Sequence, residues 1–360
     1  MKRLFTSLCV LALGFVGTAS VASAQAITYL SEDFSTATKG NNTTTNNSST
    51  GWTKTDNFSE INTVYQAGGA VKLGSGTKNG SVTTKTLNLS ENGGAFVVEF
   101  DVKGWTTVEG DIDVTITGFD KRTVKYTAVR TGEFENIKLY YTGGQENSTV
   151  TIASTAKRVF LDNLKIYPAY EVKMSEVEHA TIATERPYVI PAGLKGCVVN
   201  VENGKAKVEE LFNENDIVAG GQGLLLKGAK ADYYLQISGE TGAVNFNELN
   251  ALKPALTETV TAAMGKKLYI LANDETDGLG FYFQGSTNGA SVSGIAGKAY
   301  LEVNENEAPT QGFSFSGIVS SIEAAALVAP AKNEIYDLSG RRVSTPAKGL
   351  YIVNGKKVIR

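Results

Sequence analysis

Apolar and polar residues alternate along much of the chain and predict short β-strands. The pattern is clear at residues 96–102, 112–116 and 137–141, and it recurs more briefly at 150–152. Side chains two positions apart lie on the same face of a strand, so each run predicts a strand that is buried on one side. Turns rich in glycine and asparagine separate these runs. Several such strands at this spacing indicate an antiparallel sandwich.

The stretch that ends at Pro168 predicts the last strand of this sandwich. A period of two places Asp162 on the same face as Phe160, Leu164 and Ile166, and Pro168 is expected to end the strand because proline cannot donate to a sheet ladder. A carboxylate that faces an apolar layer is costly unless a partner neutralises it. We therefore expect Asp162 to have such a partner.

Two further units follow the first, which spans residues 25–168. Residues 169–317 contain short apolar strands divided by glycine and predict a second β-rich unit, in which 250–264 holds either one helix or an irregular connection. Residues 318–333 are expected to form a linker. Residues 334–360 predict small hairpins, because Asn354-Gly355 between two apolar runs is a strong hairpin signal.

The first 24 residues have the pattern of a signal peptide. Lys2 and Arg3 precede a mostly apolar run, and Ala22-Ser23-Ala24 fits the small-residue cleavage pattern, so the mature chain is expected to begin at Gln25. The apolar run is too short for a membrane anchor, and no later stretch predicts a membrane-spanning segment. We therefore expect an exported protein, either secreted or held at the outer-membrane surface.

Charge and cysteine content narrow the class of protein further. The chain has 34 basic and 37 acidic residues, a formal net charge of −3 that becomes −5 when Lys2 and Arg3 are removed. An acidic chain without a basic patch is a poor candidate for binding nucleic acid. Cys197 is the one cysteine of the mature chain, so no internal disulfide forms, and its apolar surroundings predict a buried, inert thiol.

The sequence lacks a catalytic constellation, and we expect a protein that is not an enzyme. His179 is the only histidine, which argues against nucleophilic triads and zinc sites because both need several oriented ligands or partners. Acidic residues such as Glu209 and Glu210 could in principle hydrolyse a glycoside, but no catalytic motif surrounds them. The glycine cluster at 220–223 lacks the lysine and hydroxyl of a phosphate-binding loop.

The first unit resembles the jelly-roll domains of the carbohydrate-binding and galactose-binding-like superfamily. The resemblance rests on Glu32-Asp33-Phe34, on Gly51-Trp52 after a polar loop, and on the run from Val159 to Leu164. It implies that the first and last strands lie side by side. It also implies a structural calcium held by Glu32 or Asp33 together with Asp162, with backbone carbonyls completing the ligands. The alternative is that Asp162 caps a turn or pairs with a lysine.

The rest of the chain resembles parts of exported Bacteroidetes proteins. Residues 169–317 are similar to a module of surface and exported proteins, with a leucine-rich strand, a Gly-Phe-Tyr strand and a Lys-Ala-Tyr-Leu strand. Residues 334–360 resemble the C-terminal sorting domain of the type IX secretion system, which implies that the export machinery is a partner. The alternative for this tail is a small structural hairpin module.

Aromatic side chains are the remaining candidates for a binding site. Sugars present flat C–H faces, and Trp105 and Trp52 are the candidate ligand-binding platforms. The alternative for each, and the more common role of a single aromatic side chain, is a core position. The sequence thus predicts an all-β protein with a jelly roll, a second β-rich domain and a small C-terminal hairpin domain. Its expected function is non-enzymatic binding of a glycan. The alternatives are a structural or adhesive surface protein without a sugar site and an accessory-domain protein with hydrolase activity.

Overall fold

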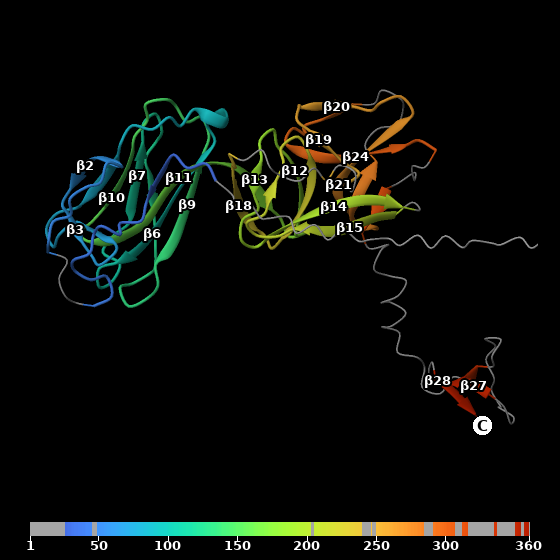
Figure 1. Cartoon of the computed structure of the whole chain (residues 1–360), viewed down its shortest axis with the longest axis horizontal. Coiled ribbons are helices and arrows are strands. Elements are labelled where there is room, and N and C mark those ends of the chain that lie inside the picture. Colours follow the sequence, from blue (N-terminus) through green and yellow to red (C-terminus); the bar gives the residue numbers. More distant parts are fainter. Residues whose placement is uncertain are drawn as a thin grey trace, which may run out of the picture.

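A computed structural model gives the fold (Figure 1). It describes residues 26–44, 49–202, 205–239, 246, 250–283, 291–306 and 312–315, and the backbone of three strands between 335 and 359. The described residues form antiparallel sheets, and their one helical element is the short 3-10 turn η1 (Glu91–Gly94). The prediction of an all-β fold is confirmed.

The first part of the chain is a sandwich of two antiparallel sheets. The larger sheet has the order β3-β4-β11-β6-β9 with β1 also paired to β11, and the smaller sheet has the order β2-β5-β10-β7-β8. From β4 to β11 the chain passes back and forth between the sheets, which is a jelly-roll arrangement. The larger sheet comprises β1 (Leu30–Glu32), β3 (Val64–Gln66), β4 (Val71–Leu73), β6 (Phe96–Gly104), β9 (Glu135–Tyr141) and β11 (Val159–Met174). The smaller comprises β2 (Phe58–Asn62), β5 (Ser81–Thr84), β7 (Ile112–Ile116), β8 (Arg122–Val124) and β10 (Val150–Ser154).

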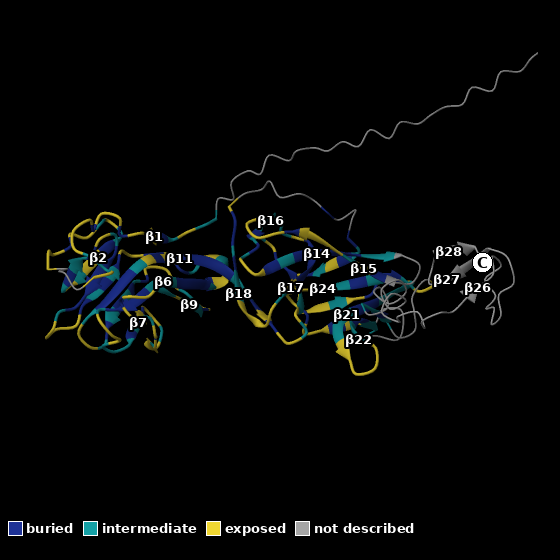
Figure 2. Cartoon of the chain, turned by 90° about the horizontal axis from the view of Figure 1, so that it is seen from below, coloured by how far each residue is buried: buried dark blue, intermediate teal, exposed yellow. Residues whose placement is uncertain are grey.

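The alternation in the sequence corresponds to the core of this sandwich. Phe96, Val98, Phe100 and Val102 on β6 are fully buried and belong to one apolar cluster with the buried side chains of β7 and β10. Figure 2 shows the buried stretches of the sandwich strands in dark blue. Strands β1 and β11 are neighbours, with Leu30 opposite Ile166, which confirms the expectation that the first and last strands lie side by side. The other side of the larger sheet, which we call the outer face, points away from this core.

A β-bulge in β11 makes one sequence prediction wrong. Asn163 has φ of 47°, and the pairing of β11 with β6 shifts register between Asp162 and Lys165. A bulge changes the phase of the alternation, so residues before and after it do not keep a period of two. Phe160 therefore packs on the outer face, whereas Leu164 and Ile166 lie in the core.

Pro168 does not end the strand, contrary to the sequence prediction. β11 continues to Met174, pairing with β6 as far as Pro168 and with β18 (Ala231–Gln236) from Ala169 onward. The carbonyl of Pro168 accepts a hydrogen bond of 3.0 Å from the N–H of Ile237. Proline is tolerated because it lies where β11 changes partners, so its missing N–H removes a single ladder bond at the end of a pairing. One continuous strand thus belongs both to the sandwich and to the part that follows.

The second part is built around a strand that is buried on both faces. β17 (Gly223–Gly228) lies between β12 (His179–Ala183) and β14 (Leu194–Glu202), and β15 (Lys205–Phe212) completes the sheet. Leu224 and Leu226 pack into one apolar cluster and Leu225 into another on the opposite face. This explains the uninterrupted run of leucines. A small sheet of β13 (Tyr188–Val189) and β16 (Ile217–Val218) lies beside it.

A third group of strands follows and shares the cluster around Leu225. Its main sheet has the order β19-β24-β21-β22-β25, with β20 and β23 paired separately. Residues 250–264, for which one helix or an irregular connection was expected, contain the strands β19 and β20. Pro254 is tolerated within β19 because β19 is an edge strand, where a missing backbone N–H need not break a ladder bond. The strands are β19 (Leu252–Ala255), β20 (Thr259–Thr261), β21 (Lys266–Asp274), β22 (Gly278–Phe283), β23 (Ser291–Ser293), β24 (Lys298–Asn304) and β25 (Gly312–Ser314).

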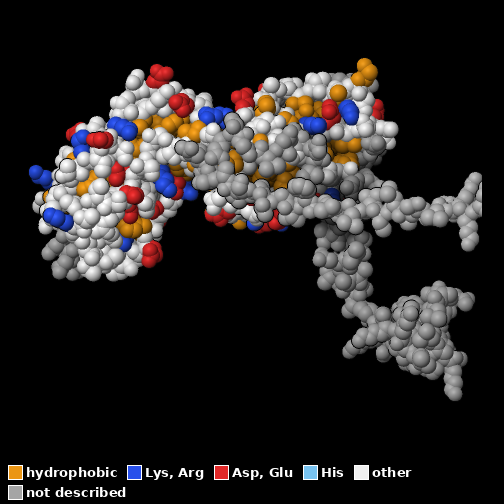
Figure 3. All heavy atoms as spheres, viewed as in Figure 1, with side chains coloured by type: hydrophobic (Ala, Val, Ile, Leu, Met, Phe, Trp, Pro, Cys, Tyr) orange, Lys and Arg blue, Asp and Glu red, His pale blue; other side chains and the backbone are white. Residues whose placement is uncertain are grey.

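The C-terminal segment contains the predicted hairpin. β27 (Leu350–Val353) pairs with β28 (Lys356–Ile359) and with β26 (Ile335–Tyr336). The expected signal peptide (1–24) and linker (318–333) lie outside the described residues. Within the part of the chain that is described, no helix has the length and apolar character needed to cross a membrane. Acidic and basic side chains are interspersed on the face seen in Figure 3, without a large basic patch.

Candidate functional site

The outer face of the larger sheet carries both aromatic and hydrogen-bonding side chains. It is formed by the residues of β3, β4, β6, β9 and β11 whose neighbours in sequence point into the core, because side chains alternate between faces. Trp105 directly follows β6 at one end of this face. The residues of the outer face that matter below are Tyr65, Lys72, Glu99, Asp101, Lys103, Asn136, Phe160 and Asp162.

Trp105 is only partly buried and lies beside two cations. Its ring packs on Phe160 with centroids 5.3 Å apart, and the guanidinium of Arg158 lies 5.3 Å from the ring centroid. Arg158 also forms a 2.6 Å ion pair with Glu109 and donates a second hydrogen bond of 3.0 Å to it. Burial opposes ionisation of Glu109, but the hydrogen bonds from Arg158 outweigh it and lower the pKa of this carboxyl group. This end of the outer face therefore combines an aromatic ring with a fixed ion pair.

Lys72 lies between two aromatic rings. Its ammonium is 4.2 Å from the ring centroid of Tyr65 and 4.7 Å from that of Trp105. Such cation–π contacts are favourable, and they hold both rings in place. Burial lowers the pKa of Lys72 to about 8, and the charge of Arg158 adds to this effect. Tyr65 and Trp105 are thus presented as a rigid pair rather than as separate surface side chains.

A network of amides and carboxylates occupies the middle of the outer face. The side-chain amide of Asn136 donates to Glu99 (3.1 Å) and Asp101 (2.8 Å), and the amide of Asn163 also donates to Asp101 (2.8 Å). Asn136 and Asn163 are exposed. Because the network fixes these groups before any ligand arrives, their remaining donors and acceptors can meet hydroxyl groups at little entropic cost.

Asp162 lies directly opposite Asp101 in the pairing of β11 with β6. Burial raises the pKa of Asp162 to about 6, and the carboxylates of Asp101 and Asp33 add to this rise, whereas the N–H of Asn163 and the Lys103 ammonium oppose it. The backbone N–H of Asn163 donates to Oδ1 of Asp162 at 2.8 Å. Like charges directly opposite each other destabilise a sheet, so ionisation of Asp162 lowers the stability of the folded protein.

Replacing Asp162 by asparagine is expected to stabilise the protein above pH 6. The folded state holds a proton on Asp162 more tightly than the unfolded state does, so wild-type stability falls as the pH rises from about 4 to 6. Asp162→Asn should remove this fall and gain about 1 kcal/mol at pH 7.5, a value reduced to allow for partial exposure of the group. Urea denaturation of both proteins at pH 4 and 7.5, in chelator, measures it. Equal gains at the two pH values would contradict the explanation.

The residues predicted to hold calcium are only partly brought together. Asp33 lies near enough to Asp162 to affect its pKa, but Glu32 is buried and both of its carboxylate oxygens accept hydrogen bonds within the protein. Oε1 accepts from the N–H of Phe34 (3.1 Å), and Oε2 accepts from Thr55 (2.5 Å) and Asn57 (3.0 Å). Among the described residues, no three His, Cys, Asp or Glu side chains form a metal-binding group. Both carboxylate oxygens of Glu32 are thus engaged within the protein, and the calcium site at Glu32 or Asp33 with Asp162 stays a prediction.

Trp52 is a core residue and not a ligand platform. It is 5% exposed and packs edge-on against Phe34 and Phe58 at centroid distances of 5.3 and 5.5 Å. Its indole N–H donates to the hydroxyl of Thr36 at 3.3 Å. Because the side chain is almost completely buried, no sugar can stack on its ring. The Gly51-Trp52 pair in the sequence therefore marks a packing position.

Several residues of the outer face were not anticipated from the sequence. Lys72 is the polar residue of the Val-Lys-Leu strand β4, and this pattern predicts a solvated side chain. The residue is instead 7% exposed, because its side chain lies between the rings of Tyr65 and Trp105. The contacts of Asn136 with β6 and of Arg158 with Glu109 join segments that are distant in sequence, so no local pattern predicts them.

Cys197 is buried as predicted, and burial raises the pKa of its thiol to about 11. The Nδ1 of His179 lies 2.9 Å from the carbonyl of Val177.

The fold and the outer face define a β-sandwich protein with an aromatic and polar surface on one sheet. No protein-family model matches the chain, and no curated protein matches it. Among solved structures, the CBM22-1 xylan-binding domain of Paenibacillus barcinonensis Xyn10C is similar to it. The match covers 40% of this chain and 96% of that domain, with 16% sequence identity and a TM-score of 0.24. We carry no residue role over from that domain.

Proposed function

We propose that the protein binds a glycan, without catalysing a reaction, through the outer face of its sandwich. The observation that carries this proposal is the partly exposed Trp105, held by Phe160 and Lys72 beside the Arg158–Glu109 ion pair. A binding site for a polar ligand needs such a combination of aromatic surface and a few fixed polar groups. The amide and carboxylate network around Asn136 supplies further fixed groups on the same face.

The geometry favours an extended ligand. Trp105 and Glu99 are six positions apart along β6, which corresponds to about 20 Å of strand. Between them the outer face presents Asp101 and the neighbouring Asp162, whereas the side chain of Lys103 is buried under Phe134. A ligand lying along β6 would contact the aromatic end and the polar network together, whereas a single small ring would reach only one of them.

We propose that the protein is exported and acts at the cell surface or outside the cell. The pattern of residues 1–24 supports export, and the similarity of residues 334–360 to type IX sorting domains supports recognition by that machinery. The paired strands β26, β27 and β28 are compatible with such a tail. Fractionation of producing cells, with and without residues 334–360, tests this: the shortened chain should remain in the periplasm, and surface delivery of both forms would contradict the sorting role.

One observation favours the structural or adhesive alternative. Of the two predicted platforms, Trp52 is in the core, and the ring of Trp105 is already in contact with Phe160, Lys72 and Arg158. Glycan binding therefore depends on the part of Trp105 that remains open. If that part is too small for a sugar, the outer face is a surface of a scaffold protein rather than a binding site.

Trp105→Ala is expected to weaken glycan binding about ten-fold or more, because a few side chains, tryptophan prominent among them, contribute most of the affinity of a binding site. Asn136→Ala should weaken it less, since one hydrogen-bonding group is lost. Thr115→Ala, an exposed change on the smaller sheet, is the control. Affinity electrophoresis through gels containing soluble polysaccharides measures all four proteins. Equal retardation of wild type and Trp105→Ala would contradict the outer-face site.

A further inference from the structure

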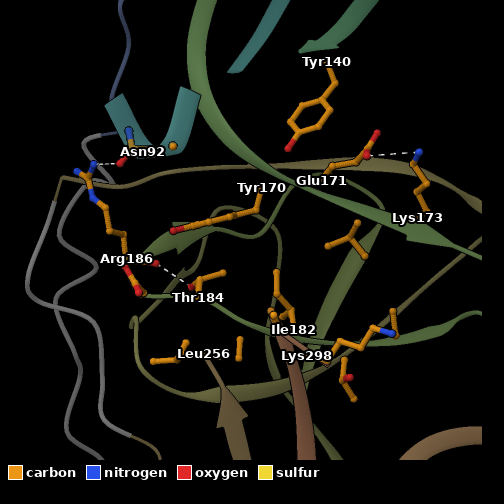
Figure 4. A pocket seen from close by; sticks show the side chains of 18 residues that line it. Asn92, Tyr140, Tyr170, Glu171, Lys173, Ile182, Thr184, Arg186, Leu256 and Lys298 are labelled. Carbon is orange, nitrogen blue, oxygen red and sulfur yellow. Dashed lines mark hydrogen bonds and ion pairs between the residues drawn. The ribbon is translucent and has the colours of Figure 1, made fainter. Parts of the chain in front are cut away.

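A cleft of about 680 Å³ opens where the sandwich meets the rest of the chain. Its walls come from η1 and β9 of the sandwich, from the second half of β11, from β12 and from the start of β24. Figure 4 shows Tyr170, Glu171 and Lys173 on one side of the opening, with Ile182 and Thr184 across from them. Consecutive residues of both strands line the cleft, at 170–173 and 180–184. Since the face of a sheet would contribute alternate residues only, the cleft exposes strand edges.

One of these edges belongs to the second half of β11. Between Ala169 and Met174 this strand pairs with β18 and with no other described strand. The bond from Ile237 N–H to the carbonyl of Pro168 shows that even-numbered residues point their backbone groups toward β18. Odd-numbered residues point the other way, as the bond from Ala169 N–H to the carbonyl of Ala95 confirms. The N–H and C=O of Lys173 therefore face away from β18.

The opposite edge belongs to β12, the outermost strand of its sheet. Its even-numbered residues face β17, because the N–H of Gly228 donates to the carbonyl of Glu178 at 3.0 Å. Its odd-numbered residues face outward, and the N–H of Ala183 donates to the carbonyl of Gly297 at 2.8 Å. The N–H and C=O of Thr181 also face outward, and no backbone hydrogen bond joins them to another described residue.

The strands β11 and β12 are consecutive, yet they do not pair with each other. A turn in which Glu178 N–H donates to the Ser175 carbonyl joins them, and from there they diverge to β18 and β17. Two strand edges, with backbone groups at Lys173 and Thr181 that no backbone hydrogen bond joins to another described residue, thus face a common space. Unpaired backbone groups on a strand edge are a template for pairing with another extended chain.

The side chains of the cleft suit a peptide better than a sugar. Ile182 is buried in the wall, and Leu256 is one of the few large hydrophobic side chains among the described residues that are exposed, at 41%. The aromatic rings are already engaged. Tyr140 stacks on Tyr234 at 5.6 Å, and Tyr170 packs edge-on against Tyr188 at 6.4 Å. The rim is charged, with the Glu171–Lys173 ion pair on one side.

We propose that this cleft binds an extended segment of a partner polypeptide, which adds as a strand to the edges at Lys173 and Thr181. Backbone hydrogen bonds supply affinity in this mode of recognition, and pockets for alternate side chains supply selectivity. The exposed Leu256 on the wall of the cleft favours a segment in which apolar and polar residues alternate. This site is separate from the outer face, and it gives the protein a protein partner in addition to a glycan.

The test uses the chain from Gln25 onward and a panel of acetylated nine-residue peptides. Valine alternates with threonine, glutamate or lysine in these peptides, and a second set carries N-methyl groups on alternate residues. At least one peptide should bind with a Kd below 1 mM by fluorescence anisotropy, and N-methylation should weaken it ten-fold or more. Failure of every peptide to bind, or equal binding after N-methylation, overturns the proposal.

Two variants locate the bound peptide. Thr181→Pro removes an N–H that makes no ladder bond to β17, so it should weaken peptide binding ten-fold or more, whereas Thr181→Val should not. Lys173→Pro, with Lys173→Ala as its control, tests the other edge. Trp105→Ala should leave peptide binding unchanged. Unchanged binding in both proline variants overturns the proposal, and so does displacement of the peptide by an oligosaccharide. If neither proline variant folds, the N-methylated peptides decide.

Discussion

Trp52→Ala should lower the free energy of unfolding by about 3–5 kcal/mol, the usual cost of truncating a large aromatic side chain in a core. Trp52 is buried among Phe34 and Phe58, so the cavity left behind cannot close without moving the sheets. Trp105→Ala should cost only about 1–2 kcal/mol, because its ring is partly in water in the folded state. Urea denaturation followed by circular dichroism measures both changes.

The two tryptophans act as controls for each other. Trp52→Ala should reduce stability strongly while the folded fraction keeps its affinity for glycan. Trp105→Ala should reduce the affinity strongly with a smaller loss of stability. Equal losses of stability would mean that Trp105 is a second core residue, which would favour the scaffold alternative.

Gly74→Ala is expected to destabilise the protein by about 3–5 kcal/mol, or to prevent folding. Gly74 has φ of 84°, and a Cβ placed there would lie 1.9 Å from the carbonyl oxygen of Lys157. The chain must approach this closely because Leu73 and Val159 are paired on β4 and β11. Relieving the clash would move β4, and with it Lys72 between the rings of Tyr65 and Trp105.

Gly69→Ala is the matched control for this substitution. Gly69 has φ of 90°, but a Cβ there meets no atom within 4 Å. Its cost should be about 1 kcal/mol, which is the backbone strain alone. Thermal melting of both variants separates the two contributions. Similar melting temperatures would show that contact with Lys157 is not what requires glycine at position 74.

The sequence was informative wherever a local pattern determined the structure. Alternation on β6 and β7 predicted their core faces correctly, because one buried side gives a period of two. It failed at Asn163, where a bulge changed the phase of β11 and turned Phe160 to the outer face. It failed again at Pro168, since a change of pairing partner in space leaves no mark on the sequence around it.

The candidate site was only half visible in the sequence for the same reason. Trp105 could be proposed because a tryptophan after a strand and a glycine is a local signal. Its neighbours Lys72 and Arg158 come from β4 and from the start of β11, and only the sheet order brings them together. Trp52 also follows a glycine in the sequence, but in the structure it is buried against Phe34 and Phe58.

A glycan array probed with the chain from Gln25 onward tests the central claim most directly. The whole chain is needed because an end at residue 168 would cut β11 in the middle. The array should be run in calcium and in chelator, with melting temperature followed in parallel, for wild type and Trp105→Ala. Binding by wild type that Trp105→Ala abolishes is the result we predict, and loss of binding or stability in chelator would add a calcium ion. Absence of glycan binding in both buffers would contradict the proposed function.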